Sequence, residues 1–177
     1  MKRLPLLALA AAVAASTPAR AQQIPPASPT IGASGGFGAG IAAPVGALSD
    51  NHAAGYILSG IVDFSAADQP FSFRAELIYQ HFDRKRDAVA GTRSMNMYSF
   101  GASLLARTPK QASSAFVIGG IGIYRATDNG TKPGVNAGAG IEVPLTFFVG
   151  MADLRFHWVM TEGRPLFTIP ITLGARF

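Results

Sequence analysis

The sequence predicts an all-β fold in which eight antiparallel strands close into an up-and-down barrel. Beyond residue 31, the 177-residue chain divides into eight short segments in which apolar side chains alternate with small or polar ones, and turn-forming residues separate the segments. This alternation has the two-residue period of a β-strand, whereas a helix requires apolar residues at three- and four-residue spacing. The chain has no cysteine, so hydrogen bonding and packing must hold the fold without disulfides.

The amino-terminal segment is predicted to be a secretory signal peptide. Lys2 and Arg3 precede an apolar stretch over 4–15, and Ala19-Arg20-Ala21 has the small-x-small pattern of a cleavage site. The apolar stretch is too short for a membrane-spanning helix. The predicted divisions of the chain are a signal peptide over 1–21, a flexible amino-terminal tail over 22–31 and a barrel domain over 32–177.

The net charge gives no reason to expect a nucleic-acid partner. The formal charge is +5, but three of the 15 basic residues lie in the predicted signal peptide, which leaves 12 basic against 10 acidic residues. A balance so close to neutral lacks the strongly basic surface that nucleic-acid binding requires. The sequence predicts no cofactor and no metal site.

The first four predicted strands each have one apolar face. Phe37 alternates with glycines in the first, and Leu58 alternates with Ser59 in the second. Leu77 and Phe100 mark the apolar faces of the third and fourth. These strands are predicted over 33–43, 53–64, 71–82 and 95–107.

The last four predicted strands follow the same pattern with one exception. The run FVIGGIGIY in the fifth is apolar at both odd and even positions, so its facing stays open and a bulge is possible. In the sixth strand, Ile141 lies on the apolar face and Glu142 on the other face. In the seventh, Leu154 lies on the apolar face and Arg155 on the other. These strands are predicted over 114–126, 135–143, 146–159 and 166–177.

The connections between the strands alternate in length. Those predicted to face outward are 44–52, 83–94, 127–134 and 160–165, and those predicted to face the periplasm are 65–70, 108–113 and the Pro144-Leu145 turn. Outer-membrane barrels have long outer loops and short periplasmic turns. The longest connection, 83–94, lies on the predicted outer side.

Aromatic residues are predicted to form two levels, as two membrane interfaces would select. The periplasmic level comprises Phe64, Phe71, Phe116, Phe147, Phe148 and Phe177, and the outer level comprises Tyr56, Tyr79, Tyr98, Tyr124 and Trp158. Only 14% of the chain is charged, which is low for the exterior of a soluble barrel. We therefore predict a transmembrane barrel; a soluble sandwich or lipocalin-like barrel is the alternative, because alternation alone does not distinguish inside from outside.

Nine ionisable side chains are predicted to point into the barrel. They are Asp63, Arg74, Glu76, Arg107, Glu142, Asp153, Arg155, His157 and Arg176. An eight-stranded barrel is just wide enough for side chains to fill. Because a buried charge without a partner is costly, we expect these residues to pair with one another as a charge network, with His157 near the outer rim. An acid–base or metal role for Glu142, Asp153 and His157 is the alternative.

The connection 83–94 is basic. Arg84, Lys85, Arg86 and Arg93 outnumber Asp83 and Asp87 within it. Guanidinium groups bind phosphate through paired hydrogen bonds, so these four residues are candidates for contact with lipopolysaccharide. A solvated loop without a ligand is the simpler interpretation.

The closing strand carries a terminal signal. Ile171, Leu173, Ala175 and Phe177 share its apolar face, and Phe177 is the last residue. This strand resembles the closing strand of Gram-negative outer-membrane barrels, and from 32 to 177 the chain resembles the small OmpA/OmpX-like barrel family. The resemblance implies insertion by the barrel assembly machinery, contact with outer-membrane lipid and lipopolysaccharide, and a structural, adhesive or surface-interaction role without a wide pore. A monomer is expected, and strand eight is expected to pair with strand one.

Two other functions are weighed against this one. A lipid A-modifying enzyme would need a serine, a histidine and a carboxylate in reach of the lipid, and Ser49, Asp50 and His52 are close in sequence, with His81 and His157 as further candidates. The chain has no His-x-Ser pair and no leading amphipathic helix of the kinds found in such enzymes, so no catalytic residue is predicted. A narrow solute pore is the second alternative.

Overall fold

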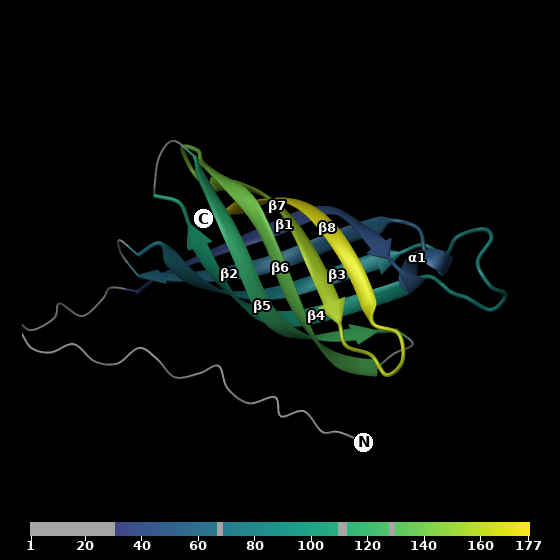
Figure 1. The fold of residues 1–177 in the computed structure, drawn as a ribbon. Coiled ribbons are helices and arrows are strands. Elements are labelled where there is room, and N and C mark those ends of the chain that lie inside the picture. Colours follow the sequence, from purple (N-terminus) through teal and green to yellow (C-terminus); the bar gives the residue numbers. More distant parts are fainter. Residues whose placement is uncertain (1–30, 67–68, 110–112, 128–129) are drawn as a thin grey trace, which may run out of the picture.

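The barrel is a single ring of eight strands (Figure 1). The computed structural model describes residues 31–66, 69–109, 113–127 and 130–177. The strands are β1 (Ile31–Val45), β2 (Gly55–Ala66), β3 (Phe71–Phe82), β4 (Met95–Arg107), β5 (Ser114–Ala126), β6 (Gly130–Pro144), β7 (Val149–Val159) and β8 (Leu166–Arg176). Each strand pairs antiparallel with the next, and β8 closes the ring against β1. The predicted all-β, up-and-down fold class is confirmed.

The observed strand boundaries agree best with the predicted ones where clear turn-forming residues flank the strand. β3, β4 and β5 have the predicted bounds, whereas β1 begins at Ile31, the last residue of the predicted tail. β6 begins at Gly130, five residues before its predicted start, because 130–134 continue the ladder with β5. The connection predicted over 127–134 is therefore wrong from 130 onward. The predicted signal peptide and residues 22–30 of the predicted tail lie outside the described residues.

The start of β7 and the first outer connection also differ from the prediction. Phe147 and Phe148 lie in a turn, where the Leu145 amide donates to the Phe148 carbonyl at 2.8 Å, and β7 begins only at Val149. The connection after β1 contains a short helix, α1 (Ala47–Asn51), that five residues are too few to reveal by periodicity. Within the described ranges, no helix has the length and apolar composition needed to cross a membrane.

The facing of β5, which the sequence left open, is regular. Phe116, Ile118 and Tyr124 are buried inside the barrel, Val117 and Ile121 are exposed on its outer face, and the pairing with β6 is continuous without a bulge. The aromatic levels are therefore wrong in two places. Phe116 and Tyr124 fill the interior instead of contributing to the exterior levels.

The interior leaves no space for a side chain at several glycines. A Cβ at Gly140 of β6 would lie 2.4 Å from Cζ of Phe116 and 2.5 Å from the carbonyl oxygen of Ala152. Both distances are far below van der Waals contact, so the large aromatic ring on β5 requires glycine at this position on its neighbour. Small residues on one strand thus make room for large ones on the next.

β1 and β8 form the seam that closes the ring. The pairing runs from Gly36 opposite Arg176 to Val45 opposite Phe167, and the Phe177 amide donates to the Gly35 carbonyl at 2.8 Å. The ring of Phe177 lies 6.1 Å from that of Phe37 on the outer face. The expected pairing of the last strand with the first is confirmed.

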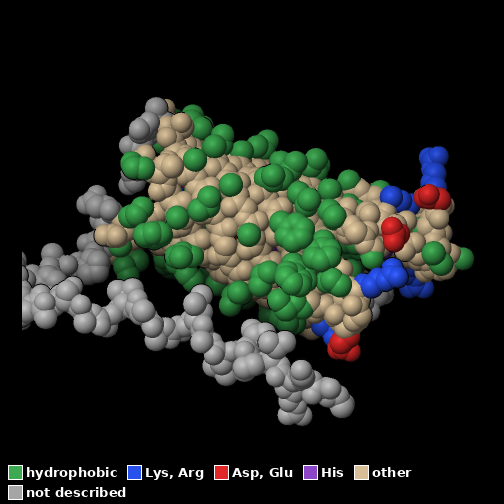
Figure 2. All heavy atoms as spheres, viewed as in Figure 1, with side chains coloured by type: hydrophobic (Ala, Val, Ile, Leu, Met, Phe, Trp, Pro, Cys, Tyr) green, Lys and Arg blue, Asp and Glu red, His purple; other side chains and the backbone are tan. Residues whose placement is uncertain are grey.

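The polarity of the barrel is inverted relative to a water-soluble barrel. Large apolar side chains are exposed along every strand, while Asp63, Arg74, Glu76 and Arg155 are buried inside. Figure 2 shows apolar and uncharged atoms over the body of the barrel, with Lys, Arg, Asp and Glu gathered at the end that carries α1. This arrangement separates the molecule into an apolar belt, a charged interior and a polar outer end.

Candidate functional site: the barrel interior and its outer end

The charged interior begins with a five-residue cluster near the end of the barrel opposite α1. Arg74 makes a paired contact with Asp63, with Nε to Oδ1 at 2.6 Å and Nη2 to Oδ2 at 2.9 Å. Arg107 reaches Asp63 Oδ2 at 3.1 Å and both oxygens of Glu142 at 3.0 Å. Arg176 contacts Glu142 at 3.1 Å and Asp63 at 3.5 Å. Three guanidinium groups and two carboxylates thus form one connected cluster.

Side chains that the sequence analysis did not single out complete this cluster. Arg107 also donates to the Ser72 hydroxyl, and Arg176 donates to the Ser34 hydroxyl at 3.2 Å. The Arg74 guanidinium lies 5.9 Å from the centre of the Phe116 ring. Ser34 and Ser72 stand at inward positions of the alternating pattern, so strand parity was the signal that could have identified them.

A smaller cluster lies farther up the barrel. Arg155 pairs with Glu76 and, at 2.9 Å, with Asp153. All three side chains are buried. The two clusters together contain four guanidinium groups and four carboxylates, so the described ionisable side chains of the interior balance in charge. Eight of the nine residues predicted to point inward are thereby brought together.

His157, the ninth, lies outside both clusters. Its side chain is fully buried, its Nδ1 lies 3.2 Å from the Tyr124 hydroxyl, and the two rings meet edge to face. The prediction that His157 belongs to the charge network is therefore wrong, although His157 does lie near the outer end of β7, two residues before Val159. Because Tyr124 turned out to face inward, the histidine has a phenol as neighbour instead of a carboxylate.

The space around His157 is small. Its Nε2, the Gln80 amide and the Thr168 hydroxyl are buried without a hydrogen-bond partner in the described structure. The adjoining cavity, which Glu76, Arg155 and His157 help to line, measures about 10 Å³. That is about the smallest volume that accommodates one water molecule. The interior at this level is a packed core, not a channel.

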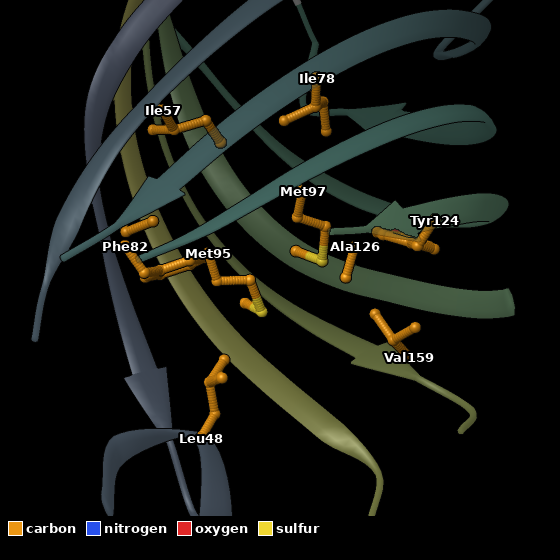
Figure 3. Packing of buried hydrophobic residues seen from close by; sticks show 10 residues of the cluster. Leu48, Ile57, Ile78, Phe82, Met95, Met97, Tyr124, Ala126 and Val159 are labelled. Atoms are coloured by element: carbon orange, nitrogen blue, oxygen red, sulfur yellow. The ribbon is translucent and has the colours of Figure 1, made fainter. Parts of the chain in front are cut away.

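An apolar layer fills the barrel above His157. Ile57, Ile78, Phe82, Met95 and Met97 pack with Val159 and with Leu48 of α1, as Figure 3 shows. Leu48 comes from the outer connection after β1, so α1 closes the barrel with an apolar side chain. Sequence reasoning missed this closure because it assigned 44–52 to a connection without a helix.

The outer connections form one folded unit with α1. The Ala53 amide donates to the Asp83 carbonyl and the Lys85 amide to the Asn51 carbonyl, each at 2.9 Å. The Asn51 side chain accepts from the Val89 amide at 3.1 Å. Residues 46–54 and 83–94 thus hold each other in place.

Of the four basic residues in 83–94, one is half-buried in a structural contact and three are exposed. The Lys85 ammonium donates to the Ser49 carbonyl at 2.5 Å and is half-buried. Arg84 donates to the Ala88 carbonyl at 3.2 Å but remains exposed, as do Arg86 and Arg93. Three of the four predicted contact residues therefore present guanidinium groups to the surroundings.

A cavity of about 520 Å³ lies between α1 and this connection. Leu48, Met95 and Leu166 give it apolar walls, while His52 and Arg93 line its polar side. His52 Nε2 lies 3.2 Å from the Arg93 carbonyl. Because a carbonyl only accepts, that nitrogen carries the proton of the bond.

His52 and His81 make contacts with groups other than Ser49 and Asp50. Ser49 donates its hydroxyl to the Gly46 carbonyl at 2.7 Å, and His52 contacts Arg93. His81 lies on the outer face, where Nδ1 is 2.7 Å from the Asn96 side-chain oxygen and Nε2 is 3.2 Å from Asp83. Among the described residues, no group of three His, Cys, Asp or Glu side chains is placed to hold a metal ion.

A further ion pair lies in the outer region between β6 and the last connection. The Lys132 ammonium contacts Glu162 at 2.6 Å, and this hydrogen bond together with the lysine charge lowers the pKa of Glu162. The Glu162 side chain is 94% exposed, so the pair contributes little to stability.

The residues of the predicted terminal signal line the seam on its apolar side. Ile171 and Leu173 are exposed on the outer face of β8, and Ala175 is half-buried beside Phe177. Leu173 is opposite Ala39 and Ala175 is opposite Phe37 on β1. The same face thus contributes both to closure and to the apolar belt.

Comparisons with known proteins show the fold of the chain. The sequence matches no protein-family model and no curated protein. The crystal structure of Neisserial surface protein A superimposes with a TM-score of 0.64 at 14% identity, over 83% of this chain and 97% of that one. Ail, the attachment invasion locus protein of Yersinia pestis, gives a TM-score of 0.47 at 15% identity over 83% and 97%. A de novo designed transmembrane β-barrel gives 0.45 at 13% over 82% and 96%.

Proposed function

We propose that this chain is an exported outer-membrane barrel whose outer connections form a contact surface for anionic ligands. The observation that carries the proposal is the inverted polarity of the ring. Apolar side chains such as Leu77, Ile121 and Leu173 are between 63% and 68% exposed. In water this belt would be a large aggregation-prone patch, whereas in a bilayer it meets hydrocarbon.

Closure of every strand edge supports the same location. A bilayer offers no water to backbone amides, so only helices and closed barrels satisfy their hydrogen bonds there. The pairing of β8 with β1 leaves no free edge in this ring. The proposed signal peptide over 1–21 and recognition of β8 by the barrel assembly machinery would deliver the chain to that membrane as a monomer.

The packed interior argues for a surface role over transport. Two ion-pair clusters and an apolar layer fill the barrel along its length. We infer a non-enzymatic role as well, because the serine and histidine of α1 and its flank make separate contacts. The name of Neisserial surface protein A is consistent with a surface role for a barrel of this shape.

The proposed ligand is lipopolysaccharide, bound through its phosphate groups. Arg84, Arg86 and Arg93 expose guanidinium groups on a connection that is fixed to α1 by hydrogen bonds. An ordered loop loses less conformational entropy on binding than a free one. Guanidinium groups bind phosphate oxygens in pairs, which gives the contact its chemistry.

Location and ligand require separate tests. We expect the protein in the outer-membrane fraction, with a different gel mobility before and after boiling; recovery in the soluble fraction would contradict the location. Planar-bilayer recordings should show no discrete conductance steps. Reproducible single-channel steps would favour the narrow-pore alternative.

The ligand test replaces Arg84, Arg86 and Arg93 together by Gln. Binding of the refolded protein to lipopolysaccharide should weaken by about tenfold or more, since the loss of even one charge-assisted hydrogen bond costs about 1.5–3 kcal/mol. Arg164→Gln, which removes an exposed arginine of another outer connection, is the matched control. Equal affinity of the triple variant and the control would remove these three residues from the proposal.

A further inference from the structure

One side chain breaks the apolar character of the outward face. Among the described strand positions that point away from the interior, Arg125 of β5 is the single Lys, Arg, Asp or Glu. It lies one residue before the end of β5, at the outer end of the barrel. Tyr98 on β4 and Thr131 on β6 are its partners in the sheet register.

Two hollows adjoin each other on the outer face, and this arginine lines the first of them. The first, about 600 Å³, is lined by Leu58, Leu77, Tyr98, Phe100 and Ile123, with Arg125 and Thr131 at its outer edge. The second, also about 600 Å³, lies toward β6 and is lined by Phe100, Ile121, Ile123, Pro133 and Val135. The two hollows share Phe100 and Ile123, so those side chains form a ridge between them.

The walls of both hollows are apolar, and the side chains that form them are exposed. Phe100 is 53% exposed, Ile123 is 54% exposed and Ile121 is 68% exposed. Hydrocarbon is the medium that the proposed membrane location offers to such surfaces. A pair of hollows on either side of one ridge accommodates two acyl chains better than one compact group.

Arg125 determines which ligand group binds at the outer end of the ridge. A guanidinium on the lipid face is costly unless it reaches the interface and an anion there. Its planar set of donors matches phosphate oxygens, and the Tyr98 hydroxyl at the same level supplies another donor. The Tyr79 hydroxyl is already committed to the Asn96 side-chain oxygen at 3.0 Å.

We propose that Arg125 and the two hollows form a site for a phosphate-bearing, multiply acylated glycolipid of the outer leaflet, the class to which lipid A belongs. The phosphate lies at Arg125, and acyl chains lie on either side of the Phe100–Ile123 ridge. The site rests on the proposed membrane location but is separate from the surface formed by Arg84, Arg86 and Arg93. One lipid therefore has a fixed place on one side of the barrel.

The test measures lipid retained by the refolded full-length protein, released from detergent and weighed by native mass spectrometry. The probes are bis-phosphorylated hexa-acylated lipid A, the same lipid without phosphate, and phosphatidylglycerol. We expect the unmodified protein to retain one bis-phosphorylated lipid A, with an affinity at least tenfold above that for the dephosphorylated form. Arg125→Gln should lower that preference, and in the Arg84→Gln, Arg86→Gln, Arg93→Gln background, which lacks the other proposed phosphate contacts, it should abolish it.

Three further variants identify the source of any loss. Arg164→Gln removes an exposed arginine that belongs to neither proposed site and should leave retention unchanged, whereas Phe100→Ala removes the ridge and should weaken all acylated probes. Leu104→Ala, an equally apolar change on the outer face of β4 but outside the hollows, should have no effect. Boiling-dependent gel mobility confirms that each variant is folded.

Three outcomes would overturn the proposal. They are equal retention by Arg125→Gln and the unmodified protein, equal retention of lipid A with and without phosphate, and phosphatidylglycerol binding as tightly as lipid A with the same dependence on Arg125. Because these measurements use purified protein, their failure is distinguishable from failure of the outer-membrane location, which is decided by fractionation of cells.

Discussion

At the scale of single residues, Asp63 holds the interior together. Its two carboxylate oxygens form ion pairs with Arg74, Arg107 and Arg176, and its side chain is fully buried. A buried ion pair is weak evidence of net stabilisation, because desolvation of the charges offsets their attraction. Removal of one partner is different, since it leaves the others buried without compensation.

We therefore expect Asp63→Ala to lower the free energy of unfolding by about 3–5 kcal/mol. Urea titration of the protein refolded in detergent, followed by boiling-dependent gel mobility, measures this value. Asp87→Ala, at an exposed position of the connection 83–94, is the control and should change stability by less than about 0.5 kcal/mol. A loss at Asp63 no larger than that of the control would mean that the three arginines find other partners.

A second residue-scale prediction concerns Gly140. A methyl group there would collide with Phe116, so Gly140→Ala should destabilise the barrel by about 1–3 kcal/mol through overpacking. Gly35→Ala is the control, because a Cβ at Gly35 meets nothing within 4 Å. The double variant Gly140→Ala, Phe116→Leu should recover part of the loss in the same titration; no recovery would indicate that the Ala152 carbonyl alone causes it.

At the scale of elements, alternation in the sequence predicted most of the strands. β3, β4 and β5 have the predicted bounds because each lies between unambiguous turn residues. The start of β6 was predicted too late because Pro133 and Gly134 are typical of turns. In the structure both lie in the ladder with β5, where proline is tolerated at a position whose amide makes no ladder hydrogen bond. α1 was missed because one helical turn has no measurable period.

The candidate site was predictable in part for the same reason. Strand parity placed eight charged side chains inside, and charge complementarity let them pair. The contacts of His157 with Tyr124 and of Arg74 with the Phe116 ring could not be predicted, because they depend on which parity of β5 faces inward. That choice is made by packing against Gly134 and Gly140 on β6, which alternation within β5 does not encode.

The element-scale prediction concerns the tie between α1 and the connection 83–94. Asn51→Ala removes the acceptor of the Val89 amide, and one such bond contributes about 1 kcal/mol. Amide hydrogen exchange at Val89 should therefore accelerate by about fivefold, while strand amides in β3 and β4 keep their protection. Asp50→Ala, an exposed neighbour in α1, is the control. Unchanged exchange at Val89 would show that other contacts hold the connection.

At the scale of the whole molecule, the ring requires β8 to meet β1 in one register. Because the chain lacks cysteine, a pair of introduced thiols reports on this contact without interference. Ala39→Cys with Leu173→Cys places the two thiols directly opposite each other on the outer face. We expect a disulfide in the folded protein that keeps the barrel closed during boiling without reductant.

The control for the seam is Ala39→Cys with Ile171→Cys, which is displaced by one position on the same face. Diagonal neighbours lie about 7–8 Å apart, beyond the usual reach of a disulfide. The displaced pair should cross-link much more slowly. Equal rates for the two pairs would mean that the seam slips between registers.

The seam also has a consequence for how the chain could be rearranged. β1 and β8 run side by side in opposite directions, so the start of one and the end of the other lie at the same end of the ring. A short covalent link from Phe177 to Ile31 would convert the barrel into a circle of eight strands joined by eight connections. New termini could then be opened in 160–165 without removing a single strand pairing, as circular permutation requires. The gene determines the order in which the strands are synthesised, whereas the strand pairings of the folded ring do not depend on that order.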